Sequence, residues 1–371
     1  MTAELLTPIT LQAPEGEGLR VRNRAFVAPM CQYAVDAEDG VPTDWHLQHL
    51  GAFAAGGFGL VVAEATAVEA RGRISARDLG LWSDAQTAAH RRVVDFVRSQ
   101  GAAAGIQLAH AGGKASTPPW LPGHADGTVS PADGGWPTIA PSDGPILDGL
   151  APASAMTRAQ IAEVVEAFAA AARRADEAGY DVAQLHGAHG YLLNEFVSPL
   201  TNRRDDEYGG DAERRMRFGI EVAEAVRAAW PAHKPLGIRV SATDWNTQGQ
   251  DVEATLAFLR ELATRGLISW VDVSSGGLRT DVPIPAGHGY QLALAARIAQ
   301  GLADLDVVVS AVGRIEDASQ AESVVVSGQA HAVSIGRAAL RNPHWAAEAA
   351  STLGVPRGQN PAAPQFWRAG W

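Results

Sequence analysis

Three side chains that can handle protons follow one apolar run near the middle of the chain. The run from Val182 to Leu185 leads directly into His186, His189 and Tyr191. Two imidazoles and a phenol at this spacing would make a poor core, but they can bind an oxygen anion and donate a proton beside it. The histidines could instead be structural or ligate a metal, although no third ligand lies at a familiar spacing.

Glycines and arginines after other apolar runs indicate an anionic ligand. Gly313 follows one run, and Gly336 with Arg337 lies between another run and a helical pattern. Backbone N–H groups, a helix N-terminus and an arginine can together hold a phosphate. Arg239 stands inside an apolar run, where a cation needs an anion or an electron-rich carbonyl nearby. Tight turns would also explain the glycines, and an internal carboxylate would also explain Arg239.

Two further residues have uncertain surroundings. Gln107 lies in an apolar run, and its amide could pair with the imide edge of a heterocycle or simply with the backbone of the core. Cys31 is the only cysteine and lies shortly before Tyr33 at the end of an apolar run. It could be a small buried hydrophobe or a site residue, and as a nucleophile it would need an adjacent base.

Eight apolar runs of strand length alternate with amphipathic segments and would position these groups. The runs are nearly continuous, as expected of parallel strands buried on both faces. They span 24–30, 58–65, 104–110, 181–186, 236–240, 270–274, 306–311 and 332–335. Helical patterns span 84–99, 157–178, 212–229, 252–265, 290–301, 316–327 and 342–353. In the second of these, Thr157 and Gln160 predict a capping box and Gly179 predicts the helix end.

This alternation predicts the α/β class, with one (β/α)8 TIM barrel as a single domain over residues 1–371 rather than a doubly wound sheet. The polar residues then meet at the carboxyl ends of the strands. The segment 117–155, rich in Pro, Gly, Asp and Ser, follows the third strand. We interpret it as a lid with a short hairpin, with a disordered loop as the alternative. Residues 354–371 form a C-terminal tail.

Composition narrows the functional class. The net charge of -11 and the pI of about 5.5 provide no basic field for nucleic acid or an anionic membrane. No apolar stretch is long enough to span a bilayer, and the N-terminus lacks the pattern of a secretory signal. A single cysteine excludes an internal disulfide and makes a cytoplasmic location the expectation.

Taken together, these motifs resemble the Old Yellow Enzyme family of flavin-dependent ene-reductases, and more closely its thermophilic-like bacterial class, which includes xenobiotic reductases. The matching stretches include RNRAFVAPMCQY, IQLAHAGGKAS, HGAHGYLLNEFVSPLTNRRDDEYGG, SIGRAALRNP and QFWRAGW. The resemblance implies a non-covalent FMN at the top of the barrel, NADPH or NADH as electron donor, and small activated alkenes as substrates. These would be α,β-unsaturated carbonyl or nitro compounds.

The resemblance also implies roles for individual residues. His186 and His189 would bind the substrate oxygen, and Tyr191 would protonate the α-carbon. Cys31 would lie at the flavin ring, and Tyr33 would help to hold the substrate. The residues implied to contact the ring, the ribityl chain or the phosphate of FMN are Ala28, Pro29, Met30, Cys31, Ala65, Gln107, His186, Arg239, Gly313, Gly336 and Arg337.

Other positions bear on assembly and on the rival function. Arg368 matches a C-terminal arginine that reaches into a neighbouring subunit's site, which implies a homodimer or homotetramer. Lys114 and Trp82 match motif positions without an assigned role, and His288 stands where relatives often have another residue. A cofactor-free phosphosugar isomerase or aldolase on the same barrel is the alternative function. An aldolase would need a lysine in a barrel strand, whereas Lys114 is expected in a loop.

Overall fold

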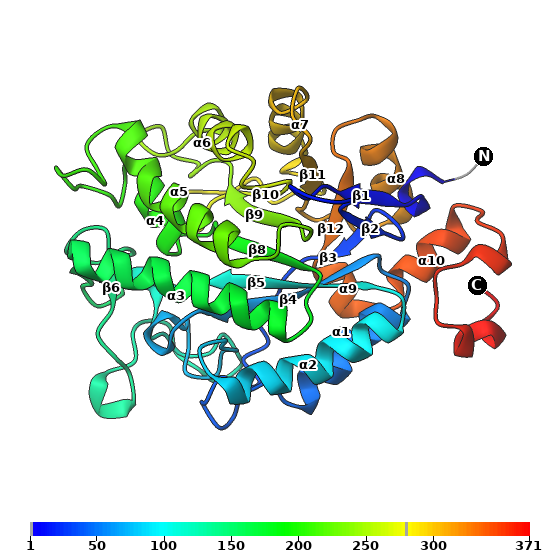
Figure 1. The fold of residues 1–371 in the computed structure, drawn as a ribbon, viewed down its shortest axis with the longest axis horizontal. Coiled ribbons are helices and arrows are strands. Elements are labelled where there is room, and N and C mark those ends of the chain that lie inside the picture. Colours follow the sequence, from blue (N-terminus) through cyan, green and yellow to red (C-terminus); the bar gives the residue numbers. More distant parts are fainter. Residues whose placement is uncertain (1–2, 279–280) are drawn as a thin grey trace.

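A closed barrel of parallel strands forms the centre of the computed structural model, which describes residues 3–278 and 281–371 (Figure 1). Around the barrel the strand order is β10-β11-β12-β3-β4-β5-β8-β9. These strands are β3 (Ala25–Val27), β4 (Leu60–Ala67), β5 (Ala103–Ala109), β8 (Val182–Gly187), β9 (Leu236–Ser241), β10 (Trp270–Ser274), β11 (Val308–Ala311) and β12 (Ala332–Ile335). Each overlaps one predicted run, so the (β/α)8 barrel is confirmed.

Helices cover the outside of the barrel (Figure 1). They are α1 (Asp44–Ala55), α2 (Asp84–Ser99), α3 (Arg158–Glu177), α5 (Ala212–Ala229), α6 (Val252–Thr264), α7 (Leu292–Gly301), α8 (Ala318–Val326), α9 (Arg337–Arg341) and α10 (Trp345–Thr352). The predicted capping box of Thr157 and Gln160 is present at the start of α3. The predicted helix 342–353 is wrong at its start, because Pro343 lies between α9 and α10.

An antiparallel hairpin closes the N-terminal end of the barrel. It consists of β1 (Ile9–Leu11) and β2 (Leu19–Val21), which sequence reasoning did not identify. The hairpin packs on a small core that includes Phe26 and Trp270, whose rings meet edge to face at 5.9 Å. Apolar side chains of the described residues thus fill this end of the barrel interior, and the opposite end is the one at which barrels of this kind bind ligands.

The segment 117–155 runs over the carboxyl ends of the strands. It contains β6 (Ile139–Ala140) and β7 (Ser154–Ala155), which pair in parallel. The expected hairpin is therefore wrong, although Gly144 and Ala153 form one antiparallel bridge. A connecting loop lets both strands run in the same direction. At its start the segment is fixed by the N–H of Thr117, which donates to the carbonyl of Ile74 at 2.8 Å.

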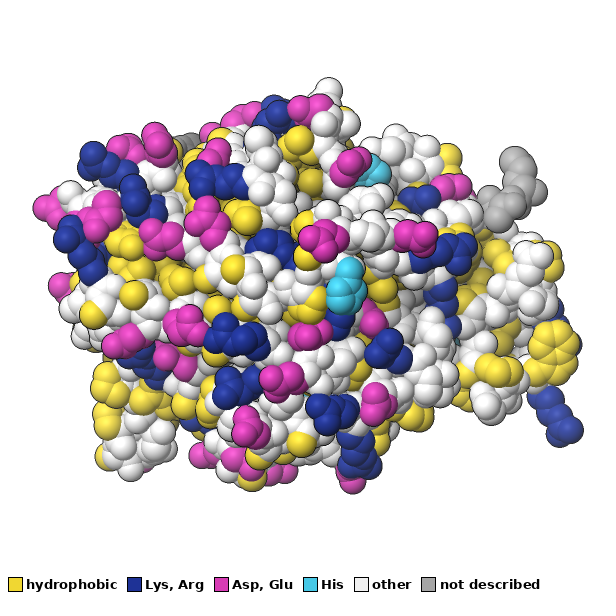
Figure 2. Space-filling view, in the orientation of Figure 1, with side chains coloured by type: hydrophobic (Ala, Val, Ile, Leu, Met, Phe, Trp, Pro, Cys, Tyr) yellow, Lys and Arg dark blue, Asp and Glu magenta, His cyan; other side chains and the backbone are white. Residues whose placement is uncertain are grey.

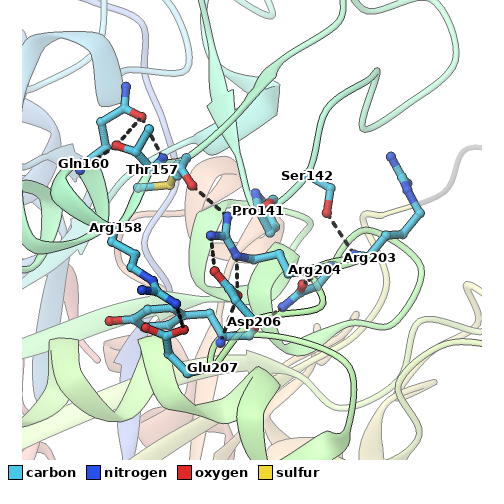
Figure 3. A network of polar contacts seen from close by, with 12 residues as sticks. Pro141, Ser142, Thr157, Arg158, Gln160, Arg203, Arg204, Asp206 and Glu207 are labelled. Carbon is cyan, nitrogen blue, oxygen red and sulfur yellow. Dashed lines mark hydrogen bonds and ion pairs between the residues drawn. The ribbon is translucent and has the colours of Figure 1, made fainter.

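Polar contacts fix the other end of this segment to the loop after β8 (Figure 3). The Arg204 guanidinium donates to the carbonyl oxygens of Pro141 at 2.9 Å and Met156 at 2.7 Å. The N–H of Arg203 donates to Ser142 Oγ at 2.8 Å. Because Arg203 and Arg204 lie in the chain that continues from His186 and His189, the segment and the loop after β8 form one connected structure.

The C-terminal tail lies far from the segment 117–155 and from the carboxyl ends of the strands below it, which we call the mouth of the barrel. It contains η5 (Arg357–Gln359) and η6 (Pro364–Ala369). The N–H of Ala363 donates to the carbonyl of Ala55, at the end of α1. In Figure 1 the tail and β6 stand at opposite ends of the longest axis. Figure 2 shows acidic and basic side chains interspersed over the face in view. None of the helices within the described ranges is long and apolar enough to cross a membrane.

Candidate active site

The carboxyl ends of the barrel strands surround a cavity with about 950 Å³ of empty space. Most of the residues predicted to bind a cofactor contribute to its wall: Ala28, Pro29, Met30, Arg239, Gly313, Gly336 and Arg337. His189 lines it as well. Sequence reasoning missed several other wall residues, namely Trp120, Tyr290, Gln291 and Ser334. They come from different loops and strands, and no local motif connects them.

One end of the cavity is suited to a phosphate. A Cβ on Gly313, whose φ is +124°, would lie 2.8 Å from Gln291 Nε2, so only glycine fits there. A Cβ on Gly336 would have only Met30 Sδ near it, at 3.6 Å, and would reduce the free space. Within the described parts of the chain, no hydrogen bond or ion pair occupies the Arg337 guanidinium. The nearby Arg314, by contrast, is engaged with Glu316.

Arg239 combines both environments that the sequence left open. Its Nε lies 3.3 Å from Asp272 Oδ2, so the internal carboxylate exists. The same guanidinium also lines the cavity. Gln107 is buried, and its Nε2 donates to Gln184 Oε1 at 2.8 Å, so its partner is a side chain and not the backbone. Gln184 Nε2 is buried without a partner in the described structure, which leaves donor capacity inside the barrel.

His186, His189 and Tyr191 pack against one another at the end of β8. His186 meets His189 edge to face at 5.3 Å and Tyr191 at 4.9 Å. Burial, reinforced by the charges of Arg239 and Lys114, holds the pKa of each histidine well below its usual range. Both imidazoles are therefore neutral at physiological pH. Each can still donate one N–H to a substrate oxygen.

Hydrogen bonds fix the ring proton of His186 and contact one ring nitrogen of His189. The N–H of Ala188 donates to His186 Nδ1 at 3.3 Å, which places the His186 proton on Nε2. His189 Nε2 lies 2.8 Å from Ser274 Oγ. When the Ser274 hydroxyl donates in this pair, the His189 proton is on Nδ1. The His189 N–H donates to Ser241 Oγ at 2.9 Å, which fixes the backbone of the loop.

Lys114, to which the motif assigned no role, holds the loop that contains His189 through hydrogen bonds to backbone carbonyls. Its Nζ donates to the carbonyls of His189 at 2.7 Å and Gly277 at 2.8 Å. It also lies 4.9 Å from the centre of the Tyr191 ring. Burial lowers the pKa of Lys114 to about 8, while the nearby Glu195 acts in the opposite direction. The loop needs such support because His189 has a φ of 61°, which is unfavourable for a residue with a side chain.

Cys31, Tyr33 and Tyr191 form a second group of reactive side chains, of which Tyr33 and Tyr191 line a cavity. Cys31 and Tyr191 pack on a small apolar cluster that contains Ala65. Burial, followed by the charges of Asp78 and Glu64, raises the pKa of the Cys31 thiol, so it is protonated at neutral pH. Burial likewise raises the pKa of the Tyr33 and Tyr191 phenols. The three groups therefore carry their protons and are uncharged.

A second, larger cavity connects the reactive residues with the segment 117–155. It has about 1420 Å³ of empty space, and Tyr33, Lys114 and Tyr191 line its inner wall. Its outer wall comes from the segment itself, at Pro118, Pro119, Trp120, His124, Asp126, Leu147, Asp148 and Leu150. Trp120 borders both cavities and is 85% exposed. This position supports the interpretation of the segment as a lid.

Several predicted site residues are part of neither cavity wall: Cys31, Ala65, Gln107, His186, His288 and Arg368. Arg368 lies in the tail, away from the mouth of its own chain. His288 is exposed on the loop before α7. Within the ranges that the structure describes, no three His, Cys, Asp or Glu residues are grouped to hold a metal ion.

Comparison with known proteins identifies the family of the chain. The sequence profile of the NADH:flavin oxidoreductase / NADH oxidase family matches residues 4–354. The NADPH dehydrogenase of Geobacillus sp. (strain WCH70) is 40% identical over 368 residues, covering 99% of this chain and 100% of that protein. NADH:flavin oxidoreductase FG08077 of Gibberella zeae is 42% identical, covering 95% and 87%. The solved structure of morphinone reductase has a TM-score of 0.74 at 25% identity, covering 100% and 90%.

The barrel, the phosphate-compatible cavity and these relatives define a flavin-dependent oxidoreductase. The chain belongs to the NADH:flavin oxidoreductase / NADH oxidase family. This confirms the predicted function, an FMN-dependent NAD(P)H oxidoreductase of the ene-reductase type. The rival isomerase or aldolase is not favoured, because the relatives that align with this chain over the whole barrel are flavin oxidoreductases and NADPH dehydrogenases.

Proposed function

We propose that His186, His189 and Tyr191 carry out the reduction of small α,β-unsaturated carbonyl or nitro compounds at the mouth of the barrel. FMN in the cavity would supply the hydride, which it receives from NADPH or NADH. The observation that carries the proposal is the packing of two neutral imidazoles and a protonated phenol beside the cavity. These groups provide oxyanion donors and a proton donor within one small volume.

The histidines would bind the oxygen of the substrate. As hydride reaches the β-carbon, negative charge develops on the carbonyl or nitro oxygen. Neutral N–H donors that are already oriented stabilise this charge without reorganisation, and each contributes roughly 2.7–4 kcal/mol by analogy with oxyanion holes. Lys114 would act as a positioning residue, because it holds the backbone of His189 in its strained conformation.

Tyr191 would donate its proton to the α-carbon. Its phenol lies next to His186 and lines the second cavity, where the substrate would enter. Because burial raises its pKa, the phenol keeps its proton until the carbanion-like carbon accepts it. Tyr33, across the same cavity, would help to hold the substrate oxygen. Cys31 would contact the cofactor as a neutral thiol and tune its potential.

The cavity wall offers groups that would contact the phosphate and the ring of FMN. Gly313, Gly336 and the unengaged Arg337 would hold the phosphate. Ala28, Pro29 and Met30 would pack on the ring, with Arg239 at its electron-rich edge. Ala65 and Gln107 are not part of this wall, and Gln107 would reach the ring edge together with its partner Gln184.

We also propose a cytoplasmic enzyme that works as a homodimer or homotetramer. The single cysteine fits a reducing compartment. Arg368 is distant from the mouth of its own chain, so it could join a site only in another subunit. A symmetric arrangement would let each tail complete the neighbouring site.

A binding experiment tests the oxyanion assignment. A substituted phenol imitates the developing enolate, and its binding can be followed through the absorbance of the bound flavin. His186→Ala and His189→Ala should each raise the Kd of the phenol about 10- to 100-fold, since hydrogen bonds to charged groups contribute about 1.5–3 kcal/mol. His233→Ala, at an exposed position, serves as the control. Unchanged phenol affinity in both site variants would contradict the assignment.

A further inference from the structure

A polar layer crosses four neighbouring strands beside the cofactor cavity. Asp272 in β10 is the Cα partner of Arg239 in β9 and of Ser310 in β11. Ser334 in β12 reaches the same carboxylate through its Oγ. Arg239 and Ser334 line the cavity, whereas Asp272 is completely buried behind them. A carboxylate therefore lies at the centre of the layer, out of reach of solvent.

Hydrogen bonds fix one oxygen of this carboxylate. Ser310 Oγ and Ser334 Oγ each donate to Asp272 Oδ1 at 2.7 Å. Trp270 Nε1 donates to Ser310 Oγ at 2.9 Å, so the serine hydrogen is free to point to Asp272. The second oxygen, Oδ2, faces Arg239 Nε at 3.3 Å. These contacts fix the orientation of the Asp272 carboxylate and hence the distance of its negative charge from Arg239.

The ion pair leaves part of the guanidinium available. Although Arg239 Nε and Asp272 Oδ2 are close, neither has an aligned hydrogen bond within the described structure. Arg239 Nη1 makes only a long contact of 3.5 Å to the carbonyl of Pro29, which also lines the cavity. The carboxylate thus balances the charge of Arg239, but the guanidinium keeps N–H groups that can bind a ligand. A buried charge without this balance would be costly.

We propose that Asp272 is a positioning residue that holds Arg239 at the cavity wall and, as its counter-charge, lowers the reduction potential of the flavin. The inference rests on the proposed function, in which FMN occupies this cavity. Two-electron reduction of FMN takes up two electrons and one proton, so the ring gains one negative charge. A nearby cation stabilises the reduced form, and a carboxylate behind the cation weakens that effect.

The sign of the effect can be tested with two substitutions. Asp272→Asn removes the negative charge but keeps an oxygen that can accept from the serines. It should strengthen the binding of reduced over oxidised FMN about tenfold, which corresponds to a rise of about 30 mV for a two-electron couple. Ser310→Ala keeps both charges but removes one donor from the carboxylate. The carboxylate then offsets Arg239 more strongly, and we expect a fall of about threefold, or roughly 14 mV.

The measurement is an equilibrium titration of the purified, FMN-loaded protein against reference dyes. Asp304→Asn is the matched control, because Asp304 also pairs with an arginine, Arg260, but lies on the surface in the loop before β11. Its potential should equal that of the wild type. The dissociation constant of FMN is measured in parallel. A wild-type protein that binds no FMN would refute the proposed function itself.

With FMN bound, an unchanged or lowered potential in Asp272→Asn overturns the inference. If this variant does not fold or does not retain FMN, Ser310→Ala decides. A lower potential in Ser310→Ala supports the role of Asp272, and an unchanged or higher potential overturns it.

Discussion

Replacement of Tyr191 by phenylalanine should separate the two halves of the catalytic cycle. The change removes one oxygen and keeps the ring, so the edge contact with His186 and the contact with Lys114 remain. In the described structure no hydrogen bond joins the phenol to another residue. The substitution therefore leaves no buried group without its partner, and the free energy of unfolding should change by less than about 1 kcal/mol.

The expected kinetic effect follows from the role of the phenol as general acid. Such groups contribute typically about 10²- to 10⁴-fold, or about 2.7–5.5 kcal/mol of activation free energy. This loss should appear only in reoxidation of the flavin by the alkene. Reduction of the flavin by NADPH needs no proton from Tyr191 and should keep its rate. Stopped-flow absorbance of the flavin measures both steps separately.

A matched variant and the pH dependence sharpen this test. Tyr208→Phe also removes a phenol oxygen, but that oxygen is bonded to Glu221 on the helical side of the barrel, so both half-reactions should be unaffected. Since burial raises the pKa of Tyr191 above its usual value near 10, the wild-type alkene step should not decline through ionisation of this group up to about pH 9. Equal losses in both half-reactions of Tyr191→Phe would refute its assigned role.

Three further predictions concern the support of the site. A Cβ on Gly277 would lie 2.4 Å from the Cα of His189, so Gly277→Ala should weaken phenol binding more than about tenfold, whereas Gly266→Ala, also at positive φ but with open space, should not. Burial raises the pKa of Asp78 to about 7, so the folded state binds more protons and stability falls as pH rises from about 4 to 7. The free energy of unfolding should therefore fall by at most about 4 kcal/mol over this pH range, as measured by urea unfolding at each pH. Asp78→Asn should reduce this pH dependence, and an unaltered pH dependence in the variant would contradict the prediction. Arg368→Ala should raise the KM for the alkene without loss of FMN, and an unchanged KM would exclude a role for the tail in a neighbouring site.

The barrel was predictable because its strands are buried on both faces, and strands of this kind have nearly continuous apolar sequences. The ends of helices were also predictable where side chains cap them, as at Thr157. The helix α1 was missed because its sequence, DWHLQHLGAFAA, has no clear division into a polar and an apolar face. The β1–β2 hairpin was missed because each strand has only three residues.

The site was only partly predictable, for a different reason. His186, His189 and Tyr191 are neighbours in sequence, so a local pattern reveals them. Lys114 acts through carbonyl groups far along the chain, and Asp272 meets Arg239 only through the register of two strands. Contacts of this kind depend on how the barrel closes, and no spacing in the sequence encodes them.

The way in which the segment 117–155 is attached has a consequence for how this scaffold can change. Hydrogen bonds hold Thr117, Val129, Trp136 and the stretch around Pro141 and Met156, whereas residues 118–128, which include Trp120, contribute mainly a wall of the outer cavity. Insertions, deletions or exchanges within residues 118–128 can therefore change which molecules enter the cavity while the reacting groups keep their places. Diversification of substrate range, in nature or by directed evolution, has a self-contained module to work on.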